Sequence, residues 1–340
     1  ITHYDEVIFM YRLGDQGQIA MIWESGTYAT TSGAAVWIGM VTNHEVDESM
    51  GVINARYAGN ASRNVGQFLD GPQTFVGTLQ FYPQDFRFVG LALGSLVDGG
   101  SPSPFTHTYN ETSTNQAVAT IPNQSLPSFA IEDFQGADVA GSHFMRTVKG
   151  CMVNELTVTA SEGEPVSVEI GYVGQNMTMG SGAKTSVTAA TTRPFMWSDV
   201  AVFIPSGTQL LRAKELTVTV SNNLETNHYL DADRTIGLPI PTNRDYTLEI
   251  TANADKTWTK TFYEQYFLGG STFNVLLRYQ ASTGSRELFW TFSGCKLIDM
   301  GVPTPGEGII EETLTVNATS SNASESSLTQ YFHAGSYAGF

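Results

Sequence analysis

The stretch KGCMVNELTVTASEGEPVSVEIGYVGQ, residues 149–175, holds two runs of alternating apolar and polar residues joined by the acidic segment SEGEP. Period-two alternation places successive side chains on opposite faces of a strand, so each run predicts a strand with one buried and one wet face. Gly163 suits the turn, and Pro165 begins the returning strand, where a missing N–H is tolerated. We therefore expect a β-hairpin here.

Composition narrows the class of protein. The chain has 340 residues, enough for two domains, and a net charge of −16. Binding along a phosphate backbone depends on Lys and Arg, so this charge disfavours a nucleic-acid-binding protein. The acids either serve solubility or would keep DNA from adhering to the wall of a pore. No apolar run reaches the roughly 20 residues needed to span a bilayer, and no signal peptide is expected near Ile1.

The second half of the chain repeats the order of the first. In the first half we expect a strand in residues 27–46, a long polar connection, a strand in 73–81 and a short helix ending at Gly94. An exposed loop rich in Ser, Pro, Thr and Gly should follow in residues 96–116. In the second half the corresponding strands are AKELTVTVSNN, 213–223, and RDYTLEIT, 244–251, followed by a helix capped by Asp255.

The repeat extends to the opening hairpin, because Gly150 and Cys151 recur as Gly294 and Cys295. Equivalent positions in separate domains lie too far apart for a disulfide, which needs a Cα separation of about 4.4–6.8 Å. We predict two free, buried thiols, Cys151 and Cys295. The predicted domains are residues 1–185, including an N-terminal arm, and residues 186–320, with a C-terminal arm in 321–340.

The C-terminal arm ends in aromatic residues. Tyr331, Phe332, Tyr337 and Phe340 belong either to a frayed tail or to an arm that packs on a neighbouring subunit.

Catalytic and metal-binding motifs are not found. The six histidines are scattered without a metal-ligand spacing, and no nucleophile elbow or phosphate-binding glycine loop occurs. Acidic pairs such as Glu162 and Glu164 lie in turns, where solvated side chains are the usual finding. We therefore expect no enzyme activity, no metal and no cofactor.

Three stretches together resemble the tail tube proteins of long-tailed viruses of bacteria and archaea. They are GTLQFYPQDFRFVGLALGS, the Gly-Cys hairpin with its GEP turn, and the second-half strands with DKTWTKTFYEQYFLGG; the resemblance covers roughly residues 30–320. It implies a mainly β fold of two tandem sandwich or barrel domains, each with a short flanking helix, long loops and terminal arms.

The same resemblance implies a structural virion protein that is made in the host cytoplasm. Copies would form stacked rings around a hollow tube for DNA delivery, and DNA would pass without specific binding. Rings of three chains with pseudo-sixfold symmetry, or of six, remain open. Further partners would be the tape measure, tail terminator and tip proteins, with no membrane contact.

The polar faces of the predicted strands are the candidates for lining such a channel. They comprise Glu155, Thr157, Thr159, Ser167, Glu169, Glu215, Thr217, Thr219, Thr247 and Glu249.

Two other classes stay open. A subunit of an extracellular β-sandwich filament or adhesin would carry glycans on its Asn-x-Ser/Thr sites. A carbohydrate-active or carbohydrate-binding module would need paired carboxylates and exposed aromatics in one cleft.

Overall fold

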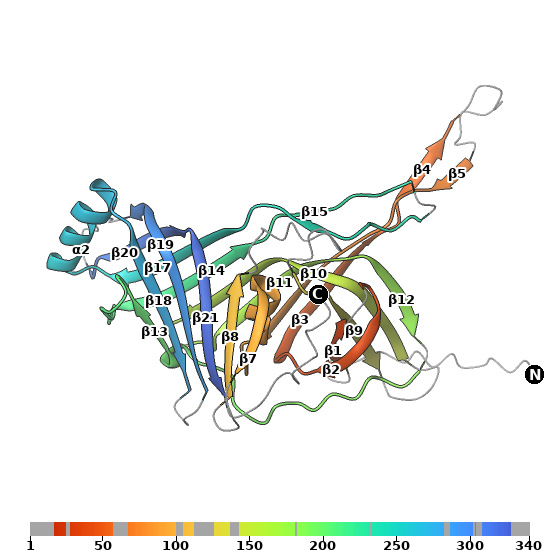
Figure 1. The fold of residues 1–340 in the computed structure, drawn as a ribbon, viewed down its shortest axis with the longest axis horizontal. Helices are drawn as coiled ribbons and strands as arrows, with labels where there is room; N and C mark the ends of the chain where they lie inside the picture. The colour runs from red at the N-terminus through yellow and green to blue at the C-terminus, as the bar shows by residue number, and fades with distance from the viewer. Residues whose placement is uncertain are drawn as a thin grey trace, which may run out of the picture.

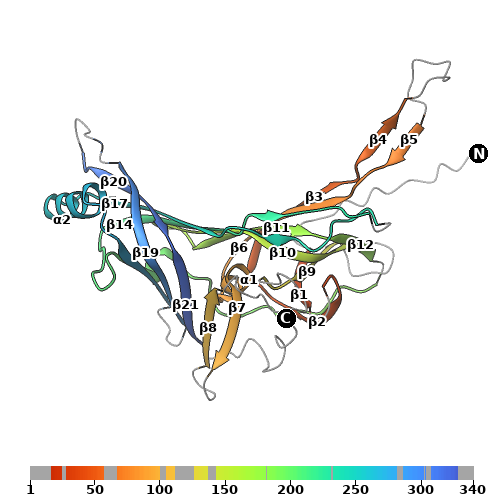
Figure 2. The ribbon, with the colours of Figure 1, turned by 45° about the horizontal axis from the view of Figure 1, so that its top comes forward.

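The computed structural model describes residues 17–24, 28–56, 67–99, 105–111, 126–136, 143–180, 182–230, 233–281, 286–301, 303 and 308–327. Strands dominate this part of the chain, which confirms the expected mainly β fold. Its α-helices are short: α1, Arg87–Leu93, and α2, Lys256–Phe262, which the π-helical turn η3, Tyr263–Leu268, extends. Figures 1 and 2 show α2 at one end of the molecule and the hairpin β4–β5 at the opposite end. None of the described helices is long and apolar enough to cross a membrane.

A single antiparallel sheet, here called the central sheet, runs through both halves of the chain. The expected hairpin forms its middle as β10–β11, and β10 also pairs with β14 of the second half. Its eight strands are, in order, β3 (Met40–Ser49), β6 (Thr74–Tyr82), β11 (Ser167–Gly174), β10 (His143–Ser161), β14 (Ala213–Ser221), β17 (Asp245–Asn253), β20 (Glu311–Ala318) and β19 (Glu287–Gly301).

Two outer sheets complete the layers. The first contains β2 (Thr31–Val36), β1 (Gln18–Glu24), β9 (Phe129–Gly136), β10 and β12 (Asn176–Gly180). The second contains β7 (Gly94–Gly99), β8 (Phe105–Glu111), β21 (Ser320–Ser327), β19, β18 (Phe273–Gln280) and β13 (Val200–Phe203). The long strands β10 and β19 each belong to an outer sheet in their first part and to the central sheet in their last. The pairings of the described strands run between open edges and close no barrel.

The core lies between the layers, under the apolar face of the central sheet. Val168, Val158, Val218, Leu248 and Val316 lie side by side on successive strands and are all buried. Burying side chains of this size stabilises a fold by about 1.5–3 kcal/mol each. The period-two pattern of the sequence therefore corresponds to a continuous dry layer across both halves.

The backbone and thiol geometry of the Gly-Cys pair is the same in both halves, which supports the internal repeat. Gly150 and Gly294 both have left-handed backbones, with φ of 66° and 60°. The thiols that follow are free and buried, and each donates to the carbonyl three residues earlier: Cys151 at 3.5 Å and Cys295 at 3.4 Å. The bounds proposed for two separate domains stay a prediction, since the halves share one sheet.

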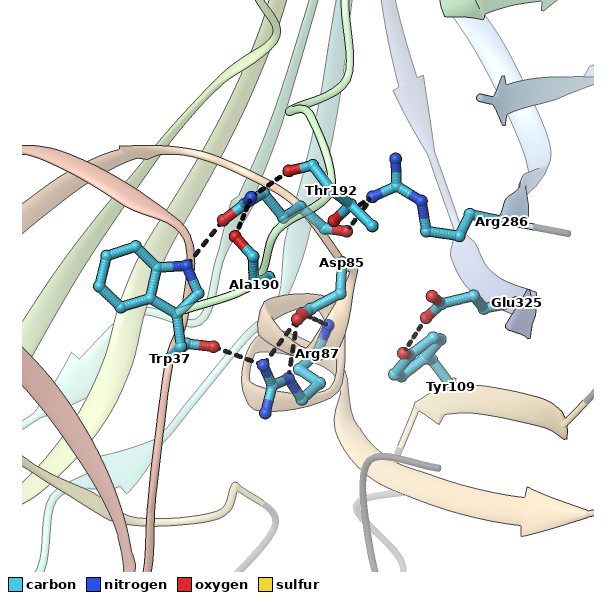
Figure 3. A network of polar contacts seen from close by, with 9 residues as sticks. Trp37, Asp85, Arg87, Tyr109, Ala190, Thr192, Arg286 and Glu325 are labelled. Carbon is cyan, nitrogen blue, oxygen red and sulfur yellow. Dashed lines mark hydrogen bonds and ion pairs between the residues drawn. The ribbon is translucent and has the colours of Figure 1, made fainter. Parts of the chain in front are cut away.

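The region expected to be an exposed loop after Gly94 was predicted wrongly. It contains β7 and β8, and β8 pairs with β21 of the second half. Tyr109 on β8 donates a hydrogen bond to Glu325 on β21 at 2.5 Å, and both side chains are buried (Figure 3). A first-half hairpin therefore extends the outer sheet of the second half.

The long connection after β3 contains a second hairpin, here called the arm. Its strands are β4 (Val52–Ala55) and β5 (Gln67–Asp70), which project away from the body in Figures 1 and 2. The corresponding second-half connection contains the short pair β15 (Leu224–Glu225) and β16 (Ile240–Pro241). Arg234 from this connection donates to the carbonyl of Gly71 at 2.8 Å, so the second-half loop braces the base of the arm.

Residues 182–194, which join the two halves and are here called the linker, are held by hydrogen bonds from both of them. Gln84, just before α1, donates through its side chain to the carbonyl of Ala190 at 3.1 Å and to that of Thr192. Arg286, between β18 and β19 and drawn in Figure 3, donates to the carbonyl of Gln84 at 2.6 Å. It also donates to the carbonyl of Arg193 at 3.1 Å. The linker is therefore a fixed part of the junction.

Arg286→Ala is expected to lower the free energy of unfolding by about 2–3 kcal/mol, because it removes the charged donor from the carbonyls of Gln84 and Arg193. Urea denaturation of the unassembled chain measures this. Arg286→Lys keeps the charge but not the planar fork and should recover part of the loss. An unchanged midpoint in the alanine variant would contradict this role.

Candidate functional site

The wet face of the central sheet, here called the polar face, is the main candidate surface. Cross-strand pairing assembles one row of polar side chains across all eight strands: Asn43, Gln80, Glu169, Thr157, Thr219, Thr247, Asn317 and Lys296. None of these side chains is buried. The row crosses the boundary between the halves without interruption, so both halves present one common surface.

Adjacent rows have the same character. One contains Ser167, Thr159, Thr217, Glu249, Thr315 and Asp299. The other contains Glu45, Thr78, Gly171, Glu155, Ser221 and Asp245. Glu215 lies beyond them, opposite Ser161 and Thr251. The structure thus brings all ten sequence-predicted channel residues onto one face; that this face lines a channel stays a prediction.

The sequence predictions missed the contributions of β3, β6, β20 and the end of β19. The alternation of Thr313, Thr315 and Asn317 with buried Leu314 and Val316 is as regular as that in the opening hairpin. It could have been used to extend the surface. The bulges in β3 and β19 interrupt the period in those two strands.

The charge on the polar face is strongly negative. Lys296 is the one basic side chain in the three rows, against carboxylates at Glu45, Glu155, Glu169, Asp245, Glu249 and Asp299. Each acid lies opposite a neutral residue or glycine, which avoids the repulsion of like charges directly across strands. No two carboxylates in these rows therefore lie directly opposite each other across neighbouring strands.

Short polar contacts hold several of these acids. Gln80 donates to Glu169 at 2.7 Å, and Ser221 donates to Glu155 at 3.2 Å. Because these bonds run along the sheet, the carboxylates remain in contact with water. The polar face can repel polyanions and hold a water layer.

A cavity of about 630 Å³ lies beside β3. His44 and Asp133 line it, but Arg146 donates to Asp133 at 3.0 Å and His44 lies 2.8 Å from the hydroxyl of Tyr172. Burial acts to raise the pKa of Asp133, but His44, Gln135 and Arg146 outweigh it and hold this pKa below its usual value. Asp133 is thus a charged partner in a structural ion pair.

The buried thiols are chemically quiet. Burial raises the pKa of Cys295 to about 11 and that of Cys151 well above its ordinary value. Since the thiolate is the reactive form, both are protonated and poorly nucleophilic near neutral pH. Within the described ranges, no group of three or more His, Cys, Asp and Glu side chains is arranged to hold a metal ion.

The central sheet has two open edges. Among the described strands, β3 pairs only with β6, and the segment of β19 from Lys296 onward pairs only with β20. Open edges offer unpaired N–H and C=O groups to another chain. Exposed apolar side chains lie near both edges and on the arm: Ile298, Met50, Val52, Ile53, Phe68 and Leu69. These features favour self-association.

The predicted C-terminal arm contacts are not tested, since Tyr331, Phe332, Tyr337 and Phe340 lie outside the described residues.

A family model described as "Phage tail tube protein" matches residues 14–318 of the chain. No curated protein matches the chain.

Proposed function

Because this chain belongs to the phage tail tube protein family, as a structural protein of the virion tail, we propose that its copies close into rings that stack into the tube for DNA delivery. The observation that carries this proposal is the central sheet, which is continuous through both halves, polar on one face and open at both edges. Joining such sheets edge to edge removes the open edges and produces a hollow cylinder. The family is defined by a structural role, which favours a protein without enzyme activity.

We infer that the polar face lines the channel. The opposite face is the core, so only the polar face can meet water in a lumen. Its carboxylates repel the phosphate backbone, while tight DNA binding would need clustered Lys and Arg. A wall of this kind lets DNA pass without holding it.

Ring size follows from the strand count. Three chains would supply about 24 strands, which at about 4.8 Å each give a cylinder roughly 37 Å across before strand tilt widens it. Six chains would give roughly twice that width. A channel matched to one DNA duplex favours three chains, with each half acting as one of six similar parts.

We propose that the arm connects successive rings. It projects away from the body, and Phe68 on it is 70% exposed, with Ile53 and Leu69 nearby. An apolar hairpin of this kind is costly to leave in water and is suited to a partner surface. A second copy in the next ring would cover it.

Electron microscopy of the purified chain tests the proposal. We expect tubes with a hollow core, and averaged cross-sections with three chains per ring and pseudo-sixfold symmetry. Persistent compact monomers at high concentration would overturn the proposed assembly, and rings of six chains would overturn the proposed ring size.

The charge of the channel wall gives a separate prediction. Tubes of the variant Glu169→Lys/Glu249→Lys should retain roughly ten times more short duplex DNA than wild type at low salt, and lose it at high salt. Co-sedimentation measures the retained DNA.

The control for this experiment is Glu264→Lys/Glu287→Lys, which changes the net charge equally at sites outside the polar face. Equal retention by both variants would argue against a channel lined by Glu169 and Glu249.

A further inference from the structure

We propose that neighbouring chains join through β19 of one copy and β3 of the next, in the register of the internal β10–β14 joint, with Asp299 opposite Ser49. This inference rests on the proposed ring assembly and specifies its lateral interface. It follows from the internal repeat, because the joint between the halves of one chain supplies a template for the joint between chains.

Bulges fix the correspondence between β10 and β19. Against its hairpin partner, β10 shifts register between Val153 and Glu155, and β19 shifts between Leu297 and Asp299. Both shifts begin two residues after the buried cysteine of the strand. Asp299 is therefore the equivalent of Glu155, and Ile298 is the equivalent of the bulged Asn154.

A second pair of bulges relates β3 to β14. The register shifts between Val41 and Asn43 in β3, and between Ala213 and Glu215 in β14. Counting onward from each bulge, Ser49 corresponds to Ser221.

The backbone just after these strands agrees with that count. Gly51 and Asn223 occupy equivalent positions, and both have positive φ, 24° and 48°. A left-handed residue at the same place in both halves marks the same turn from the central sheet into the long connection.

The internal joint shows which contacts the template contains. Glu155 lies opposite Ser221, whose hydroxyl donates to the carboxylate at 3.2 Å. Transferred to the outer edges, this pair becomes Asp299 and Ser49, again a carboxylate and a serine. The outer edges thus preserve the chemistry of the pair at the position that sets the register.

The neighbouring position, that of the bulged residue, is polar in the internal joint but apolar at the outer edges. Inside the chain, Asn154 accepts backbone N–H bonds from Asn222 and Leu224, both at 2.8 Å. At the outer edges the equivalents are apolar and exposed: Ile298 at 51%, Met50 at 46% and Val52 at 64%. The proposed register brings these three side chains together, so an apolar contact replaces a polar one and covers side chains that one chain leaves in water.

The proposed ladder is shorter than the internal one. Pro303 follows β19 and lacks the N–H group that would extend the pairing. The joint between chains should therefore depend more on the apolar cluster than the joint within a chain does.

Disulfide cross-linking tests the register. The variant Ser49→Cys/Asp299→Cys places two thiols on directly opposed residues, whose Cα separation of about 4.5–5.5 Å permits a disulfide. Assembled tubes should give covalent multimers on a non-reducing gel after mild oxidation. The buried native thiols should not interfere, which the two single variants verify.

The matched control is Asp47→Cys/Asp299→Cys, whose thiols would be opposed only if the strands slipped by two residues. It should give at least tenfold less cross-linked product. The register would be overturned, with the tube function intact, if tubes form normally but the control variant cross-links more than Ser49→Cys/Asp299→Cys, or if neither variant cross-links. Failure of the wild-type chain to form tubes would instead overturn the proposed function.

Discussion

Phe68→Asp is expected to leave the rings intact and to stop them from stacking into tubes. Phe68 lies on β5 of the arm, away from the central sheet and largely exposed, so its replacement should cost little folding stability. Covering an exposed phenyl ring of this size contributes about 3 kcal/mol to a contact. A charge in its place should raise the concentration needed for stacking by two orders of magnitude or more.

Light scattering and electron microscopy distinguish single rings from tubes. Phe68→Tyr keeps the ring and should stack nearly as wild type does. Phe289→Asp introduces the same charge at an exposed aromatic residue on the outer sheet, and tubes should still form. If Phe68→Asp assembles tubes at the wild-type concentration, the arm does not make the axial contact.

The order of neighbouring residues was enough to predict the opening hairpin, the repeat and the helix cap. Leu156 and Val158 alternate with polar residues, so the opening hairpin and its wet face could be read directly from the sequence. The repeat of Gly150 and Cys151 at Gly294 and Cys295 indicated the duplicated plan. The cap at Asp255 was also correct, since its side chain accepts from the backbone N–H groups of Thr257 and Trp258.

Long-range pairing determined the parts that could not be predicted. The segment containing β7 and β8 is rich in Ser, Thr, Pro and Gly, which is typical of a loop, yet it forms strands because β21 supplies a partner. The pairing of β10 with β14 likewise joins segments far apart in sequence, and no periodicity reports which strand lies next to which. The polar face was predictable strand by strand, whereas its continuity across both halves was not.

Ile298→Asp is expected to abolish lateral assembly, which should leave folded single chains. Ile298 is the bulged residue of β19 and is half exposed, so the fold should tolerate a polar side chain there. In the proposed joint, however, the new carboxylate would lie beside Asp299 and near Met50 and Val52 of the neighbouring chain. An unpaired charge in an apolar contact costs several kcal/mol, more than a short ladder can offset.

The informative control is Ile298→Asn, because asparagine occupies the equivalent internal position, Asn154. An amide there can accept the backbone N–H of Val52 as Asn154 accepts that of Leu224, so assembly should persist at a moderately higher protein concentration. Analytical ultracentrifugation separates single chains from rings, and circular dichroism checks the fold of each variant. If aspartate and asparagine weaken assembly equally, Ile298 lies outside the joint. If only aspartate blocks it, the outer edges pair as the two halves already do within one chain.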